Sequence, residues 1–167
     1  MVCYTTFMTI RPATKEDKKQ ILKLIHEFDE YFAHEHLFLG EILPFTEYKN
    51  KNELLESVVD NWLQNEENFI FVADENASLV GYIIGSIQAK KERILDKEGS
   101  IDEWFVTESE RSTGIGRLLY NALLRVFKEN NCNHIGLKVY STNKNTIDMY
   151  HKMGFMDLEL TMVKKID

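Results

Sequence analysis

A glycine-rich loop at the start of a predicted helix is the part of this sequence best suited to chemistry. In the stretch ESERSTGIGRLLYNALL, Gly114 and Gly116 lie where a leucine-rich amphipathic helix must begin, although glycine costs about 1 kcal/mol relative to alanine inside a helix. The first turn of a helix has unpaired N–H groups and about half a positive elementary charge. Without side chains in the way, a phosphate group can rest directly on these amides. The pattern therefore indicates an anion-binding loop, with Arg111 as an adjacent cation.

Two common phosphate-binding loops do not fit this pattern. A P-loop requires Lys and then Ser or Thr after its second glycine, whereas Arg117 and Leu118 follow Gly116. A dinucleotide-binding fingerprint requires a third glycine where this sequence has Leu119, and it belongs to the first strand-to-helix turn of its domain. A nucleotide-binding domain that uses the same loop in another way stays as an alternative.

Periodicity predicts the elements that must position this loop. The first elements are a strand at 7–11, a helix after the capping-box-like TKED that starts at Thr14, and a helix through 54–62. The remaining expected elements are strands at 69–74, 79–89 and 99–106, the glycine-bearing helix at 115–127, a strand at 134–140, a short helix at 146–152, and a last strand after 155. This β-α-α-β-β-β-α-β-α-β order indicates an α/β (mixed α+β) fold, with a sheet that is antiparallel early and parallel around the glycine-bearing helix.

Composition limits the classes of partner. The 167 residues suit a single domain over 1–167, with 1–7 as a dispensable lead-in. The net charge of −7 argues against nucleic acid or an anionic membrane as the main partner. There is no signal-peptide pattern and no apolar run near the roughly 20 residues that span a bilayer. Cys3 and Cys132 have no metal-type spacing and are expected to be reduced thiols, so a cytoplasmic protein is predicted.

The loop and a second motif together resemble a known family. A hydrophobic strand ending at Val106, followed by Arg111-x-x-Gly114-x-Gly116 at the start of an amphipathic helix, is similar to the acyl-CoA site of the GNAT superfamily of N-acetyltransferases. The segment VYSTNKNTIDMYHKMGF has an Asn after a strand, a Tyr on a short helix and a closing Gly-Phe, and the opening TIRPATKED resembles the N-terminal unit of the family. The resemblance covers nearly the whole chain and implies a GNAT-like mixed sheet flanked by helices.

The resemblance also implies where acetyl-CoA, as co-substrate, would bind. Its pyrophosphate would lie on the amides of the loop and helix start, and its pantetheine arm would pair with the preceding strand, one of whose N–H groups would polarise the thioester carbonyl. Asn143 is implied near the cofactor, with Asn145 as a rival, and Tyr150 near its sulfur. No metal is implied. The implied cofactor-binding residues are Trp104, Phe105, Val106, Arg111, Ser112, Thr113, Gly114, Ile115, Gly116, Arg117, Asn143 and Tyr150.

The transfer chemistry adds catalytic candidates. A lysine-like amine with a pKa of about 10.4 must lose a proton before it attacks, which costs roughly 4–5 kcal/mol at pH 7, so a base, a water relay or a desolvating pocket is needed. Related small-amine acetyltransferases often have an acid at the position of Asp102, which is the preferred base, with Glu103 as the alternative. Strand alternation places Asp102 on the face of Trp104, and Glu103 on the other face unless a bulge intervenes. Tyr150 is the candidate acid that protonates the departing thiolate.

These inferences lead to one functional hypothesis with named alternatives. The chain is expected to move an acetyl group from acetyl-CoA to a primary amine by direct attack in a ternary complex. The acidic balance favours a small cationic amine as acceptor. A protein N-terminus or lysine is the close alternative, and a non-catalytic CoA-binding sensor module is the third. The resemblance is also compatible with a homodimer.

The surroundings of the acceptor are less well defined by the sequence. The resemblance implies that the loop after the first helix and the second helix line the acceptor pocket, with Tyr31, Phe32, Phe38 and Trp62 shaping it. His34 and His36 form an HxH pair in that region. Without a third ligand in the sequence nearby, a solvated loop explains them better than a metal site.

Overall fold

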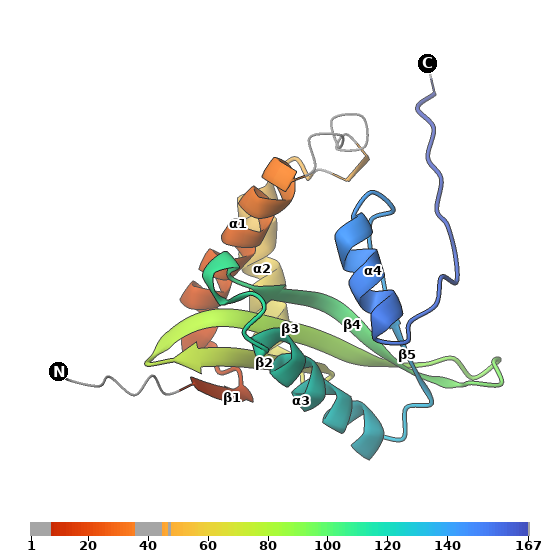
Figure 1. Cartoon of the computed structure of the whole chain (residues 1–167), viewed down its shortest axis with the longest axis horizontal. Coiled ribbons are helices and arrows are strands. Elements are labelled where there is room, and N and C mark those ends of the chain that lie inside the picture. The colour runs from red at the N-terminus through yellow and green to blue at the C-terminus, as the bar shows by residue number, and fades with distance from the viewer. Residues whose placement is uncertain (1–7, 36–44, 47, 167) are drawn as a thin grey trace.

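The computed structural model describes residues 8–35, 45–46 and 48–166, with the backbone alone at 32–35. Along the described chain the elements follow one another in the order β-α-α-β-β-β-α-β-α, and Figure 1 shows their arrangement. The strands are β1 (Met8–Pro12), β2 (Asn68–Glu75), β3 (Ser78–Ala89), β4 (Lys97–Val106) and β5 (His134–Leu137). The helices are α1 (Lys18–Glu35), α2 (Lys51–Gln64), α3 (Ile115–Glu129) and α4 (Lys144–Lys152), with short 3-10 turns η1 (Lys15–Asp17) and η4 (Glu108–Glu110).

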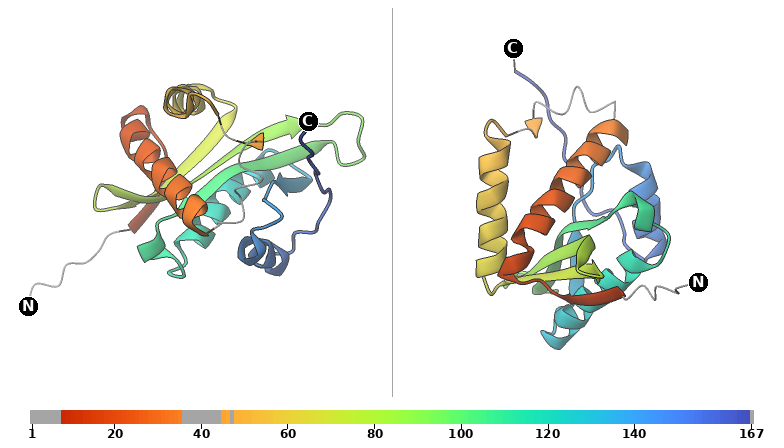
Figure 2. Two further views of the ribbon diagram at one scale, coloured as in Figure 1. Left: turned by 90° about the horizontal axis from the view of Figure 1, so that it is seen from above. Right: turned by 90° about the vertical axis from the view of Figure 1, so that its left-hand side faces the viewer.

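The described strands form one mixed sheet in the order β1-β2-β3-β4-β5. Neighbouring strands are antiparallel from β1 to β4, whereas β4 and β5 are parallel and are connected through α3. The prediction of a mixed α/β fold, antiparallel early and parallel around the glycine-bearing helix, is therefore confirmed. Helices α1 and α2 cover one face of the sheet, and α3 covers the other (Figure 2).

Each face of the sheet has its own hydrophobic core. The core under α1 and α2 includes the fully buried Tyr82 and Ile84 of β3 together with Phe105 of β4. The core under α3 includes Ile83, and α3 packs closely on β4 at Gly99. A Cβ atom there would lie only 2.5 Å from the Phe127 ring, so glycine is needed for α3 to pack this closely on β4.

The first helical segment begins at the predicted capping box. The backbone N–H of Thr14 donates to the Asp17 carboxylate at 2.7 Å, and the N–H of Asp17 donates back to the Thr14 carbonyl. Asp17 is buried and forms an ion pair of 2.8 Å with Arg11 of β1, which also pairs with Asp74 of β2. The cap therefore also ties the helix to two strands.

Two expectations about the end of the chain are wrong. The parallel strand ends at Leu137 and not at residue 140, and residues 156–166 form no strand although one was expected after 155. Alternating apolar residues in 156–166 do predict an extended segment, but a strand also needs a neighbour to pair with. Along the described chain, this segment has no such neighbour. None of the described helices combines the length and hydropathy required to cross a bilayer.

Candidate functional site

The glycine loop leaves the start of α3 uncovered. Gly114 is the N-cap residue with φ of +95°, in the left-handed region that favours glycine, and no side chain caps the helix. A Cβ atom at Gly114 would meet nothing within 4 Å. Ser112 also has a positive φ, of +65°, and the N–H groups of the first turn of α3 have no partner within the helix. This geometry suits an anion placed against the helix N-terminus.

The Arg111 side chain contacts the end of β4 and Tyr31 of α1. Its Nε donates to the Val106 carbonyl at 3.2 Å. The guanidinium carbon lies 3.7 Å from the centre of the Tyr31 ring, within the range of a cation–π contact. Arg111 thus connects the end of β4 to α1, and its role as the cation beside the loop stays a prediction. Tyr31 was expected in the acceptor pocket, and its contact with Arg111 was not foreseen.

Several other loop residues are committed to the fold through their side chains. Thr113 Oγ1 donates to the Glu110 carbonyl at 2.6 Å. The side chains of Ile115 and Phe105 are buried in the cores of opposite faces. At Ile115 and Phe105 only the backbone can contact a ligand, whereas the exposed Thr113 hydroxyl can still accept a hydrogen bond.

Strands β4 and β5 are paired over only part of their length. Their register runs from Glu98–His134 to Ile101–Leu137. Beyond Ile101, residues 102–106 of β4 have no partner strand on the β5 side within the described chain. This edge presents backbone donors and acceptors beside the start of α3, so an extended ligand arm can pair with it.

A β-bulge places the two adjacent carboxylates on one face. Gly85 of β3 lies opposite Ile101 and Ile84 lies opposite Glu103, so Asp102 is the extra residue on β4. Glu103 then points to the face covered by α1 and α2, and Asp102 points there too. The expectation that Asp102 shares its face with Trp104 is wrong, because strand alternation fails at the bulge.

Glu103 is held by a buried tyrosine. The Tyr82 hydroxyl donates to Glu103 Oε2 at 2.8 Å, and Tyr82 is completely buried. Burial raises the pKa of Glu103 to about 7, and the nearby negative charge of Asp29 contributes to the increase, whereas the hydrogen bond from Tyr82 opposes it. A carboxyl group with this pKa is poised to exchange protons near neutral pH.

Asp102 lies in a different environment. It is exposed, and its two carboxylate oxygens accept hydrogen bonds from Ser86 Oγ at 2.9 Å and Ser100 Oγ at 2.7 Å. These two serines lie opposite each other on β3 and β4. Asp102 therefore adds negative charge to the same face as Glu103 without being desolvated.

Tyr150 belongs to an aromatic cluster on the opposite side of β4. Its ring centre lies 6.1 Å from that of Trp104 and 5.6 Å from that of Phe155, and Trp104 stacks on Tyr120 of α3. Burial raises the pKa of the Tyr150 hydroxyl above its ordinary value, so this hydroxyl stays protonated. It makes no hydrogen bond to the described part of the chain and is available to donate one.

Asn143 begins α4. Its side-chain oxygen accepts a hydrogen bond from the Thr146 N–H at 3.3 Å, as an N-cap residue does. The helix begins at Lys144, two residues earlier than predicted, so Asn145 lies inside it and does not cap it. Arg117 lies in the first turn of α3.

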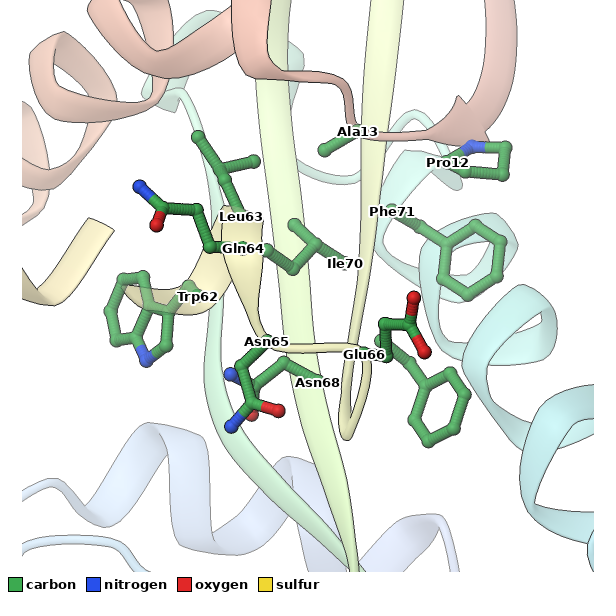
Figure 3. A pocket seen from close by; sticks show the side chains of 11 residues that line it. Pro12, Ala13, Trp62, Leu63, Gln64, Asn65, Glu66, Asn68, Ile70 and Phe71 are labelled. Atoms are coloured by element: carbon green, nitrogen blue, oxygen red, sulfur yellow. The ribbon is translucent and has the colours of Figure 1, made fainter. Parts of the chain in front are cut away.

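The expected acceptor side is only partly described. Phe38 and His36, and the side chains of Phe32 and His34, lie outside the described residues. Trp62 instead lines a shallow pocket of about 280 Å³ formed by the end of α2 and the start of β2 (Figure 3). That pocket contains none of the candidate catalytic residues, so we do not assign it to the site.

The chain is similar to known proteins in sequence and in structure. The family model described as "Acetyltransferase (GNAT) family" matches residues 23–155. An N-alpha-acetyltransferase of Sulfurisphaera tokodaii is 32% identical over 104 residues, which are 59% of this chain. The match spans 62% of that relative, less than two thirds of its length.

Solved structures share the fold over nearly the whole chain. A tetramutant of a Bacillus halodurans protein is similar with a TM-score of 0.78 and 25% identity, covering 95% of this chain and 99% of that one. An aminoglycoside N-acetyltransferase in complex with CoA is similar with a TM-score of 0.73 and 17% identity, covering 99% of each chain.

Proposed function

Because the chain belongs to the GNAT acetyltransferase family, and is therefore an acyltransferase, we propose that it transfers an acetyl group from acetyl-CoA to a primary amine. The observation that carries this proposal is the uncapped start of α3 beside the unpaired edge of β4. The amides at the start of α3 can bind the diphosphate of the co-substrate, and the backbone edge of β4 can pair with its amide-containing arm. We further propose that residues 1–167 act as a single cytoplasmic domain.

The described residues fit this co-substrate. The amides of residues 112–117 would hold the pyrophosphate, because Gly114 leaves the space above them open. The backbone of Trp104, Phe105 and Val106 would pair with the pantetheine arm. Asn143 would lie near the cofactor, as the family pattern implies, and its hydrogen bond to Thr146 would fix its orientation. When bound, acetyl-CoA supplies an activated acyl group with a thiolate as leaving group.

We propose Glu103 as the general base, ahead of Asp102. A base must be unprotonated and have a pKa near the working pH, and burial gives the Glu103 carboxyl a pKa of about 7. The hydrogen bond from Tyr82 occupies Oε2 and fixes the side chain, which leaves Oε1 to take the proton of an ammonium group directly or through water. Asp102 would attract the cationic acceptor by its charge.

We propose Tyr150 as the general acid. Its ring contacts Trp104, which follows Glu103 in β4. The proposed base is therefore Glu103 itself, and the proposed acid packs on the next residue of the same strand, whose side chain points to the opposite face. Burial keeps its hydroxyl protonated, and the hydroxyl would give that proton to the departing sulfur. No covalent acyl-enzyme is required, because the amine attacks the thioester carbonyl itself.

The proposed acceptor is a small cationic amine. Asp102 and Glu103 bring negative charge to the face of the sheet under α1 and α2, where Asp29 of α1 is paired with Lys51 at 2.8 Å. A protonated amine is attracted to such a face before it loses its proton. The structural neighbour that acts on aminoglycosides supports this class of acceptor.

A protein N-terminus is the second candidate acceptor. The 32% identity to an N-alpha-acetyltransferase favours it. The acceptor classes can be compared in one assay of thiol release from acetyl-CoA, with aminoglycosides, polyamines, lysine-like amines and short peptides with free N-termini. Rapid release with small polycations supports the proposal, and release only with peptides favours the second candidate. Binding of CoA without release for any amine would indicate the non-catalytic sensor.

A further inference from the structure

Two ion pairs connect α1 and α2 at opposite ends of the two helices. Lys18 at the start of α1 lies 2.8 Å from Asp60 near the end of α2. Lys51 at the start of α2 lies 2.8 Å from Asp29 in the second half of α1. The helices run side by side in opposite directions (Figure 2). The two pairs therefore have the same chemistry and different surroundings.

The turn of α1 that carries Asp29 is fixed over the end of β4. The Phe28 ring packs edge to face on Phe105, with 5.6 Å between the ring centres. Tyr31 lies against the Arg111 guanidinium, and Arg111 Nε donates to the last carbonyl of β4. Contacts on both sides of Asp29 thus hold it at the part of β4 that has no partner strand on the β5 side within the described chain.

Asp29 is close enough to the candidate base to affect its charge. Burial raises the pKa of Glu103 and of the Tyr82 hydroxyl, and the negative charge of Asp29 adds to both increases. Charges act on each other strongly at short range in a medium less polar than water. A cation bound to Asp29 would therefore lie near Glu103, on the same face of the sheet.

The Lys51 ammonium can be replaced on Asp29 by another cation. Asp29 Oδ2, the oxygen that faces Lys51 Nζ, is shut off from solvent and accepts no hydrogen bond from the described residues, so the contact is an ion pair without a directed bond. The Lys51 side chain is 47% exposed, and the partial positive charge of the helix start disfavours an ammonium group there. A buried carboxylate without a partner is costly, so whatever displaces Lys51 must itself pair with Asp29.

Resting on the proposed function, we propose that Asp29 is a specificity-determining residue that binds a second ammonium group of the acceptor, and that Lys51 occupies this place in the free protein. The acceptor is then a diamine. One amine gives a proton to Glu103 and bonds to the acyl carbon as the C–S bond breaks, and the thiolate takes a proton from Tyr150. The other amine stays charged and replaces Lys51 on Asp29. A monoamine can make only the first of these contacts.

Rates of thiol release from acetyl-CoA test the role of Asp29. Linear diamines of increasing length are each compared with the n-alkylamine of the same length, beginning with putrescine and n-butylamine. The quantity is the ratio of kcat/KM for the diamine to that for the monoamine, because a change in the base affects both amines and cancels. Asp29→Asn should lower this ratio by about 10- to 100-fold, as expected for the loss of a hydrogen bond between charged groups. Lys51→Met should raise it, because the diamine no longer competes with the lysine.

The other ion pair supplies matched controls. Lys18→Met and Asp60→Asn break a contact of the same length between the same two helices, and they should leave the ratio unchanged. Circular dichroism melting must show that all four variants are folded, and a gain in Lys51→Met cannot result from misfolding. Thiol release with the same ratio in Asp29→Asn as in Asp60→Asn would overturn this assignment alone. Absence of thiol release with every amine would overturn the proposed function, and the role of Asp29 with it.

Discussion

The Tyr82 hydroxyl donates a 2.8 Å hydrogen bond to Glu103 Oε2, and the two residues come from neighbouring strands of the sheet. Burial raises the pKa of Glu103 to about 7, while this hydrogen bond acts in the opposite direction. A tyrosine in a hydrophobic core thus holds a carboxyl group that titrates near neutral pH, beside the unpaired part of β4. The first two predictions depend on this pair.

The rate of acetyl transfer should rise with pH through about 7, because only the carboxylate form of Glu103 accepts a proton and its pKa is about 7. Glu103→Gln should lower kcat by about 10²- to 10⁴-fold, the usual contribution of a general base. The measurement is the pH profile of kcat/KM for thiol release. The same profile for Asp102→Asn should keep its rising limb near pH 7. A limb that disappears in Asp102→Asn and persists in Glu103→Gln would give the role of base to Asp102.

Tyr82→Phe should move that rising limb to higher pH. The hydroxyl stabilises the charged carboxylate, so its removal raises the pKa of Glu103 further. Activity at pH 7 should fall and should recover at more alkaline pH. If Tyr82 had only a structural role, Tyr82→Phe would lower kcat/KM by the same factor at every pH. If the rising limb came from titration of the acceptor amine and not of Glu103, the limb would stay at the same pH in Tyr82→Phe.

Tyr150→Phe should lower kcat while changing CoA affinity little. The phenyl ring preserves the contacts with Trp104 and Phe155, and only the proton donor is lost. General-acid catalysis typically contributes about 10²- to 10⁴-fold. Stopped-flow rates and calorimetric titration of CoA separate the two effects. Equal losses of rate and of affinity would leave Tyr150 as a packing residue.

The ion pair between Arg11 and Asp17 should make stability depend on pH in the acid range. The Arg11 guanidinium lowers the pKa of Asp17 from 3.8 to about 2 in the folded protein. The carboxylate therefore stabilises the fold fully above about pH 4, and this contribution is lost as pH falls towards 2. At 1.36 kcal/mol per pKa unit, it amounts to about 2 kcal/mol.

Asp17→Asn should lower the free energy of unfolding by about this amount at pH 7. Urea denaturation at pH 7 and at pH 3 measures the difference between the two proteins, which should shrink at the lower pH. A difference that does not vary with pH would mean that the cap, and not the charge, accounts for the loss.

Local features of the fold could be predicted from the sequence. The capping box from Thr14 to Asp17 depends on four consecutive residues, and the helix after Gly114 depends on periodicity and a glycine start. Both are determined within a few residues of the chain. They appear in the structure where they were expected.

Features that depend on two distant segments could not be predicted in this way. The bulge at Asp102 arises from the pairing of β4 with β3, and it reversed the expected face of that carboxylate. Tyr82 was not among the residues that the sequence singled out. The only available signal was a tyrosine hydroxyl inside the apolar run LVGYII, where a buried donor needs a partner.

The central claim is that the bare start of α3 binds the diphosphate of CoA, and calorimetric titration of CoA into Gly114→Asp and Gly114→Asn tests it most directly. Asp and Asn tolerate the left-handed φ of +95° at this position similarly and have the same shape, so the pair differs only in charge. Binding should be lost in Gly114→Asp, which adds both a side chain and a negative charge, and weakened less in Gly114→Asn, which adds the side chain alone, with both proteins folded. Unchanged affinity of both variants for CoA would contradict the claim.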